Sequence, residues 1–162
     1  MMVGGVRSRL VVSVIVLFLL PTVSADSAIE LGEVVRLGEV DLGLEGATIS
    51  PDGEIVIAHG ADSSIFLIEA TRPQAHSRLP WDGSEVLLDA DFHPGGQTAF
   101  IVGEEGIVLR FTRVDSAVGS AGGELYFGQT ELRAVSWNAD GSWAYIGGEM
   151  GWIWRARSLE GG

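Results

Sequence analysis

One stretch of this sequence occurs three times, and the three copies align without a gap over residues 46–68, 89–111 and 134–156. A four-residue turn sequence in each copy starts at Ser50, His93 and Asn138, so the copies are spaced by 43 and 45 residues. Repetition at a period of 20 to 50 residues indicates that each copy is one small structural unit, which buries its apolar face against its neighbours. We therefore expect three similar units placed side by side.

Each copy is expected to contain three short strands separated by tight turns. A Gly closes the first turn in every copy, and another Gly recurs seven residues later. Gly suits such turns because it accepts positive φ. Apolar and polar residues alternate before the first turn, and the runs after it are rich in β-branched and aromatic residues, as is typical of strands. The fold class is therefore predicted to be all-β.

A fourth strand is expected to link neighbouring copies. The candidates are His76 to Trp81 after the first copy and Glu124 to Phe127 after the second, while residues 29–40 could complete the last sheet. This organisation predicts three four-stranded sheets around residues 44–81, 87–128 and 132–157 of a domain that spans residues 26–162.

The turn Ser50-Pro51-Asp52-Gly53, with Gly60 after it, resembles the WD40-like, YVTN-type family of β-propeller repeats over about residues 29–157. A weaker resemblance, through the sequence VGEEGIVLR at 102–110, is to BNR-like and photosystem-assembly-factor-like propellers. These resemblances imply that each copy is a propeller blade. Sialidase chemistry is not implied, because Gly53 follows Asp52 directly and the strict Asp-box does not fit.

Three blades are fewer than the four to eight that usually close a propeller. Three alternatives follow from this count. The chain is a fragment of a longer propeller, or two copies associate into a six-bladed ring, or the three blades stand alone as an open stack.

Residues 1–25 are predicted to be a signal peptide. Arg7 and Arg9 precede an apolar run from Leu10 to Leu20, and small residues before Asp26 place the cleavage after Ala25. The apolar run is shorter than the roughly 20 residues that span a bilayer as a helix, so no stable membrane anchor is expected after cleavage. The predicted location is secreted, periplasmic or at the cell surface.

The composition argues against several functions. The chain has no Cys, and all ten basic residues are Arg, which excludes thiolate chemistry and catalytic lysines. Two of these Arg lie in the predicted signal peptide, whereas all 22 acidic residues follow it, so a nucleic-acid partner would be repelled. The acidic remainder is expected to be soluble in an extracellular medium.

Asp89, Asp91 and His93 are the polar residues considered for a central-channel site. Asp89 and Asp91 share one face of a strand and could act as an acid and base pair or bind Ca²⁺. Thr48 and Ser136 align with Asp91, which instead favours a repeated hydrogen-bonding position. His59 and His93 could ligate a metal, but structural roles are favoured, so no metal or cofactor is expected.

Aromatic residues gather in the third copy, where Trp143, Trp152 and Trp154 could form an interaction surface or pack against another blade. No known catalytic motif is present. We therefore expect a non-enzymatic, exported propeller module that binds a protein partner. The alternative is a hydrolase or small-ligand-binding propeller that uses Asp89, Asp91 and His93 in its channel.

Overall fold

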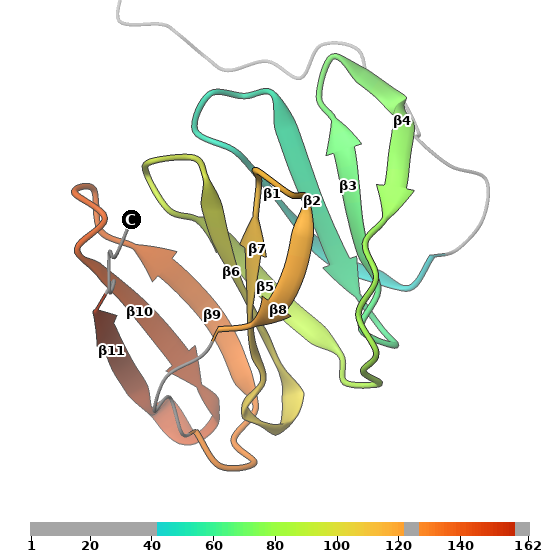
Figure 1. The fold of residues 1–162 in the computed structure, drawn as a ribbon. Coiled ribbons are helices and arrows are strands. Elements are labelled where there is room, and N and C mark those ends of the chain that lie inside the picture. Colours follow the sequence, from blue (N-terminus) through green and yellow to red (C-terminus); the bar gives the residue numbers. More distant parts are fainter. Residues whose placement is uncertain (1–41, 122–126, 158–162) are drawn as a thin grey trace, which may run out of the picture. The chain divides into compact units, whose positions relative to one another are not determined.

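The computed structural model describes residues 42–121 and 127–157, which belong to one compact unit of the chain (Figure 1). They form three antiparallel sheets of four, four and three strands, one sheet for each copy of the repeat. The predicted all-β fold is confirmed. The predicted signal peptide, residues 1–25, and the predicted strand over residues 29–40 lie outside the described residues.

Sheets 1 and 2 are four-stranded meanders, in which each strand pairs with the next. Sheet 1 comprises β1 (Leu44–Ile49), β2 (Ile55–Gly60), β3 (Ile65–Glu69) and β4 (Arg72–Arg78). Sheet 2 comprises β5 (Leu87–Phe92), β6 (Thr98–Gly103), β7 (Val108–Thr112) and β8 (Ala117–Ser120), with the short 3₁₀ turn η1 (Glu104–Gly106) between β6 and β7.

Sheet 3 has the same order as the first three strands of the other sheets. It comprises β9 (Leu132–Trp137), β10 (Trp143–Gly148) and β11 (Ile153–Arg157), with the 3₁₀ turn η2 (Glu149–Gly151) between β10 and β11. The first strand of each sheet lies beside the first strand of the next sheet, since β5 contacts both β1 and β9.

The turn after the first strand is the same in all three sheets, which confirms the repeat alignment. The backbone N–H of the fourth turn residue donates to the carbonyl of the first, as in Gly53 to Ser50, at 2.8 to 3.0 Å. The closing residues Gly53, Gly96 and Gly141 have φ of 73°, 72° and 73°. Because a side chain at such φ is strained, Gly is favoured there.

The second recurring Gly has a different cause, which is a close approach of two strands. A Cβ at Gly60 would overlap the carbonyl oxygen of Gly43, and a Cβ at Gly103 would overlap that of Val86. In each sheet the register between the first and second strands shifts at this place. The backbone at the start of the first strand therefore lies close to the end of the second strand.

The fourth strands lie earlier in the chain than predicted. The structure places β4 at Arg72–Arg78, which shares only its last three residues with the predicted His76 to Trp81. It places β8 at Ala117–Ser120 rather than at Glu124 to Phe127, of which only Phe127 is among the described residues. Both strands follow the third strand through a short hairpin. They are outer strands with almost no buried residues, so they lack the apolar alternation that marks a half-buried strand.

Two apolar clusters hold the three sheets together. We call the face of a sheet that meets the following sheet its front face, and the face that meets the preceding sheet its back face. The front of sheet 1 and the back of sheet 2 form the first cluster, through Ile55, Ile57, Ile65 and Leu67 against Ala90, Phe92, Ala99, Ile101, Leu109 and Phe111. The front of sheet 2 and the back of sheet 3 form the second, through Phe100, Val102 and Val108 against Val135, Trp137, Ala144, Ile146, Trp154 and Ala156.

Candidate functional site

Asp89 and Asp91 reach from the first strand of sheet 2 to the first strand of sheet 3. Their carboxylates accept hydrogen bonds from the backbone N–H groups of Val135 and Trp137, each at 2.8 Å. Both acceptors are partly buried, and a charged acceptor forms a stronger hydrogen bond than a neutral one. The two residues therefore connect the backbones of neighbouring sheets.

His93 makes a third contact between the same two sheets. Its Nδ1 accepts a hydrogen bond from the backbone N–H of Gly95 at 3.0 Å, so Nε2 carries the proton and donates to the carbonyl oxygen of Gly141 at 3.1 Å. The imidazole also packs edge-to-face on the indole of Trp137, with ring centroids 4.9 Å apart. Both ring nitrogens are thus engaged.

The structure places Asp89, Asp91 and His93 on the same side of sheet 2, along its boundary with sheet 3. Each side chain hydrogen-bonds a backbone group of sheet 3. This geometry favours a structural role for the three residues.

His59 lies in the other boundary, between sheets 1 and 2. It is buried, with 1% of its surface exposed, and its Nδ1 lies 3.0 Å from the carbonyl oxygen of Leu87, to which it donates. The ring fits over Gly46, where a Cβ would contact it. His59 and His93 therefore serve different boundaries. Among residues 42–121 and 127–157, no group of three or more His, Asp or Glu could hold a metal ion.

Arg113 joins the turn of sheet 1 to sheet 2. Its guanidinium pairs with the Asp52 carboxylate at 2.5 Å and with the Glu54 carboxylate at 2.6 Å. The Ser50 hydroxyl, followed by Arg113, lowers the pKa of Asp52 from 3.8 to about 2. This ion pair could not be identified from the sequence. Arg113 lies just outside the aligned copies, and 61 residues separate it from Asp52.

Trp143, Trp152 and Trp154 of the third copy do not form one surface. Trp154 lies on the back face of sheet 3, where it packs edge-to-face on Phe127 with ring centroids 5.2 Å apart. Trp152, which is 59% exposed, stacks beside it at 6.2 Å. With Met150, which is 86% exposed at the tip of the β10–β11 hairpin, Trp152 forms an exposed apolar surface that we call the hairpin rim.

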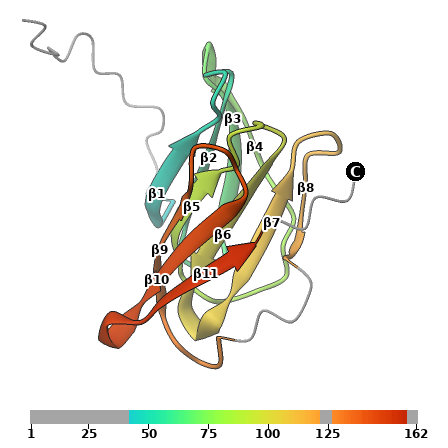
Figure 2. The ribbon, with the colours of Figure 1, turned by 90° about the vertical axis from the view of Figure 1, so that its left-hand side faces the viewer.

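Trp143 lies on the opposite, front face of sheet 3, because it pairs across the strands with Arg157 while Trp154 pairs with Ile146. Its ring is covered by the guanidinium of Arg155, at 3.9 Å from the centroid, and Arg157 lies 5.9 Å away. Tyr145 and Ile153 share this face and are 45% and 74% exposed. Figure 2 shows this side of the sheet turned toward the viewer.

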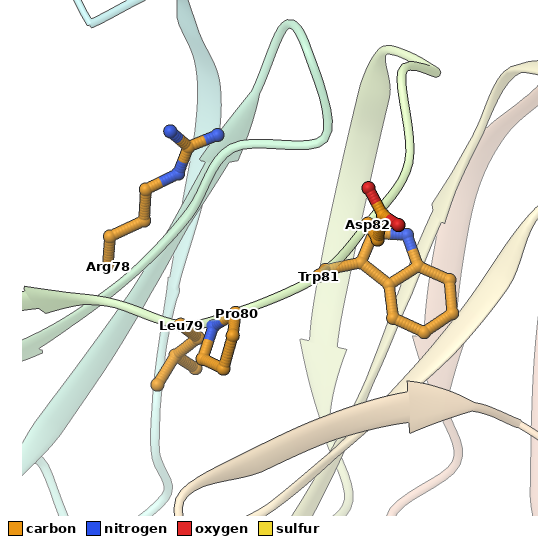
Figure 3. Close-up of a pocket in the computed structure, with 5 residues that line it drawn as sticks. All are labelled: Arg78, Leu79, Pro80, Trp81 and Asp82. Carbon is orange, nitrogen blue, oxygen red and sulfur yellow. The ribbon is translucent and has the colours of Figure 1, made fainter.

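A hollow of about 770 Å³ lies along the connection from sheet 1 to sheet 2 (Figure 3). Five consecutive residues line it, namely Arg78, Leu79, Pro80, Trp81 and Asp82. In Figure 3, Leu79 and Pro80 lie between Arg78 and Trp81, so the polar groups do not converge on one point. Ligand pockets usually have polar groups that converge on the ligand, and the polar groups that line this hollow do not converge.

No helix in the part of the chain that the structure describes has both the length and the apolar character needed to cross a membrane.

Comparison with known proteins identifies the fold. No protein-family profile and no curated protein sequence matches the chain. Among solved structures, the C-terminal WD40 domain of Sif2 is similar, with a TM-score of 0.56 and 13% sequence identity. The match covers 72% of this chain and 34% of that one, so this chain matches about a third of the length of that domain. The three packed sheets correspond to part of a WD40 β-propeller.

Proposed function

We propose that this chain is an exported, non-enzymatic propeller module that binds another protein through the hairpin rim of sheet 3. The observation that carries the proposal is the exposure of Met150 and Trp152 at the end of a structured hairpin. Exposed Trp and Met side chains are enriched where proteins bind one another, and Trp is a frequent source of binding energy.

The rim is pre-organised for binding. Trp152 stacks on Trp154, which in turn packs on Phe127, so the exposed indole is held by two partly or fully buried aromatic rings. A side chain that is already fixed loses less conformational entropy when a partner covers it. The WD40-type fold alone does not assign this role, because propellers carry many functions.

The alternative of a hydrolase or small-ligand propeller has less support. It would use Asp89, Asp91 and His93, and all three side chains hydrogen-bond the backbone of sheet 3. These hydrogen bonds support the association of sheets 2 and 3. The hairpin rim is therefore the better candidate for a binding site.

The rim is tested by affinity capture from extracellular proteins of the source cells, with the wild type, Trp152→Ala and Val114→Ala as baits. Val114 is 87% exposed but lies outside the rim, which makes it the matched control. A partner retained by the wild type and by Val114→Ala should be lost by Trp152→Ala. With purified components, the Kd should rise about tenfold or more for Trp152→Ala. Equal binding of every captured protein by Trp152→Ala would contradict the proposal.

Export is tested separately, in a secretion-competent host. The protein recovered from the medium or periplasm should begin at Asp26, as the small residues before that position predict. Recovery of a chain that still starts at Met1 in the membrane fraction would replace cleavage with retention of the leader.

A further inference from the structure

Three Asp-Gly pairs occur in the chain, at residues 52–53, 82–83 and 140–141. Aspartate isomerises most readily when Gly follows it, because Gly has no Cβ to hinder attack by its own backbone nitrogen. In that reaction the nitrogen bonds to Cγ of the preceding Asp. The reaction therefore needs a free N–H, a free carboxyl group, and a backbone that can bring the two together.

The first pair lies in the turn of sheet 1, where both reacting groups are engaged. The backbone N–H of Gly53 donates to the carbonyl oxygen of Ser50 at 2.8 Å. The Asp52 carboxylate accepts a hydrogen bond from the Ser50 hydroxyl at 2.6 Å and pairs with Arg113. The Ser50 hydroxyl, followed by Arg113, keeps the pKa of Asp52 at about 2. Asp52 thus stays ionised, and a carboxylate reacts poorly because it has no hydroxyl that can leave as water.

The third pair is held in the same way in the turn of sheet 3. The backbone N–H of Gly141 donates to the carbonyl oxygen of Asn138 at 3.0 Å. The Asp140 carboxylate accepts hydrogen bonds from the backbone N–H and the hydroxyl of Ser142, at 2.8 Å and 2.5 Å. These hydrogen bonds must break before the Gly141 nitrogen can attack the carboxyl group.

The second pair, Asp82 and Gly83, lies outside the strands, in the connection from sheet 1 to sheet 2 (Figure 3). Asp82 is exposed. Neither its carboxylate nor the backbone N–H of Gly83 has a hydrogen-bond or ion-pair partner within the described part of the chain. A Cβ at Gly83 would lie 2.6 Å from both the Trp81 indole nitrogen and the Glu85 carboxylate, so packing disfavours a larger residue there.

The backbone around this pair is anchored on either side of it. The backbone N–H of Leu79 donates to β3 at 2.8 Å, and that of Ser63 donates to the carbonyl oxygen of Glu85 at 2.9 Å. Among the described residues, no backbone-to-backbone hydrogen bond involves residues 80–84. The segment between the anchors can therefore change its backbone angles without breaking a sheet ladder.

We propose that Asp82 isomerises spontaneously to isoaspartate in the folded protein, through a succinimide formed with Gly83. The Gly83 nitrogen attacks Cγ of the neutral Asp82 carboxyl group, and the amide proton leaves with the carboxyl hydroxyl as one water molecule. Water then opens the ring. Its addition at Cγ restores aspartate, whereas its addition at the α-carbonyl leaves the main chain running through Cβ and Cγ. The mass of the chain is unchanged, and the link between sheets 1 and 2 becomes one atom longer.

The test incubates the purified protein at mildly acidic pH, both folded and unfolded in guanidinium chloride, and then digests it with trypsin. Cleavage after Arg places the three Asp-Gly pairs in three different peptides. Methylation by an isoaspartyl methyltransferase measures the isoaspartate, and fragmentation in a mass spectrometer locates it. In the folded protein, Asp82 should isomerise at least about tenfold faster than Asp52 and Asp140, because their hydrogen bonds must break first. In the unfolded chain the three rates should be similar.

Asp82→Glu is the matched control, because it keeps the charge but would have to close a less favourable six-membered ring. This variant should gain no isoaspartate in the peptide that carries residue 82, and its circular dichroism should equal that of the wild type. Equal rates at the three pairs in the folded protein would overturn the proposal. So would a folded protein in which Asp82 stays unchanged while the unfolded chain isomerises.

Discussion

Asp91 in β5 accepts a hydrogen bond from the backbone N–H of Trp137 in β9 at 2.8 Å, across 46 residues of sequence. Asp89 repeats the contact with Val135 one step along the same strands. These bonds satisfy N–H groups on the edge of β9 that do not pair with β10. The two carboxylates thus stabilise the boundary between sheets 2 and 3.

Replacement of Asp91 by Ala should lower the free energy of unfolding by about 1 to 3 kcal/mol, because a partly buried N–H of Trp137 loses its acceptor. Asp91→Asn should cost less, since its amide oxygen can still accept the bond without the charge. Asp115→Ala, in the exposed turn between β7 and β8, is the control. Urea unfolding measures all three. If Asp91→Ala and Asp115→Ala unfolded at the same urea concentration, the boundary role of Asp91 would be wrong.

Gly103→Ala should be strongly destabilising, by about 1 to 3 kcal/mol or more, because the new methyl group would overlap the backbone carbonyl of Val86. Gly119→Ala is the matched control in the same sheet, where a Cβ has no neighbour within 4 Å. It should change stability by no more than about 0.5 kcal/mol. Thermal unfolding of the two variants compares them directly, and equal midpoints would contradict the close approach of β5 and β6.

The turn of sheet 1 should make stability depend on pH in the acid range. The pKa of Asp52 is about 2 in the folded protein, below its ordinary value of 3.8, mainly because the Ser50 hydroxyl and then Arg113 favour the carboxylate. A depressed pKa contributes stability that is complete above 3.8 and is lost as the pH falls toward 2. The wild type should therefore exceed Asp52→Asn in stability at pH 6, and the difference should shrink between pH 4 and pH 2.

Urea titrations at several pH values measure this difference, and Ser50→Ala should reduce the same pH dependence, because it removes the largest cause of the shift. High salt should weaken only the part due to Arg113, since exposed ion pairs are screened. A difference that stayed constant down to pH 2 would argue against the hydrogen-bonded carboxylate.

The indole N–H of Trp137 is buried and has no hydrogen-bond partner within residues 42–121 and 127–157. The second repeat has Phe92 at this position, where it is 4% exposed. Trp137→Phe should therefore retain most of the packing while it removes an unsatisfied donor. Its loss of stability should be less than half that of Trp137→Ala, for which about 3 to 5 kcal/mol is expected. Chemical unfolding measures the stability of both variants. Equal losses of stability would contradict the prediction, because they would show that a phenyl ring cannot replace the indole of Trp137.

Local features of the fold could be predicted from the sequence. The turn that Gly53, Gly96 and Gly141 close depends on residues only a few positions apart, and strand alternation has the same short range. The outer strand β4 was misplaced because its residues are nearly all exposed, so burial left no periodic signal in them.

The sequence by itself determined three copies of a strand-and-turn unit, because turn chemistry, glycine placement and apolar alternation act between near neighbours in the chain. Only the tertiary structure decided what Asp89, Asp91 and His93 do, and that Trp143 and Trp154 lie on opposite faces of sheet 3. Those outcomes depend on strand register and on which sheet faces meet. The contacts that result join residues 46 to 61 positions apart, such as Val135 with Asp89 and Arg113 with Asp52, and no local pattern encodes which pair will meet.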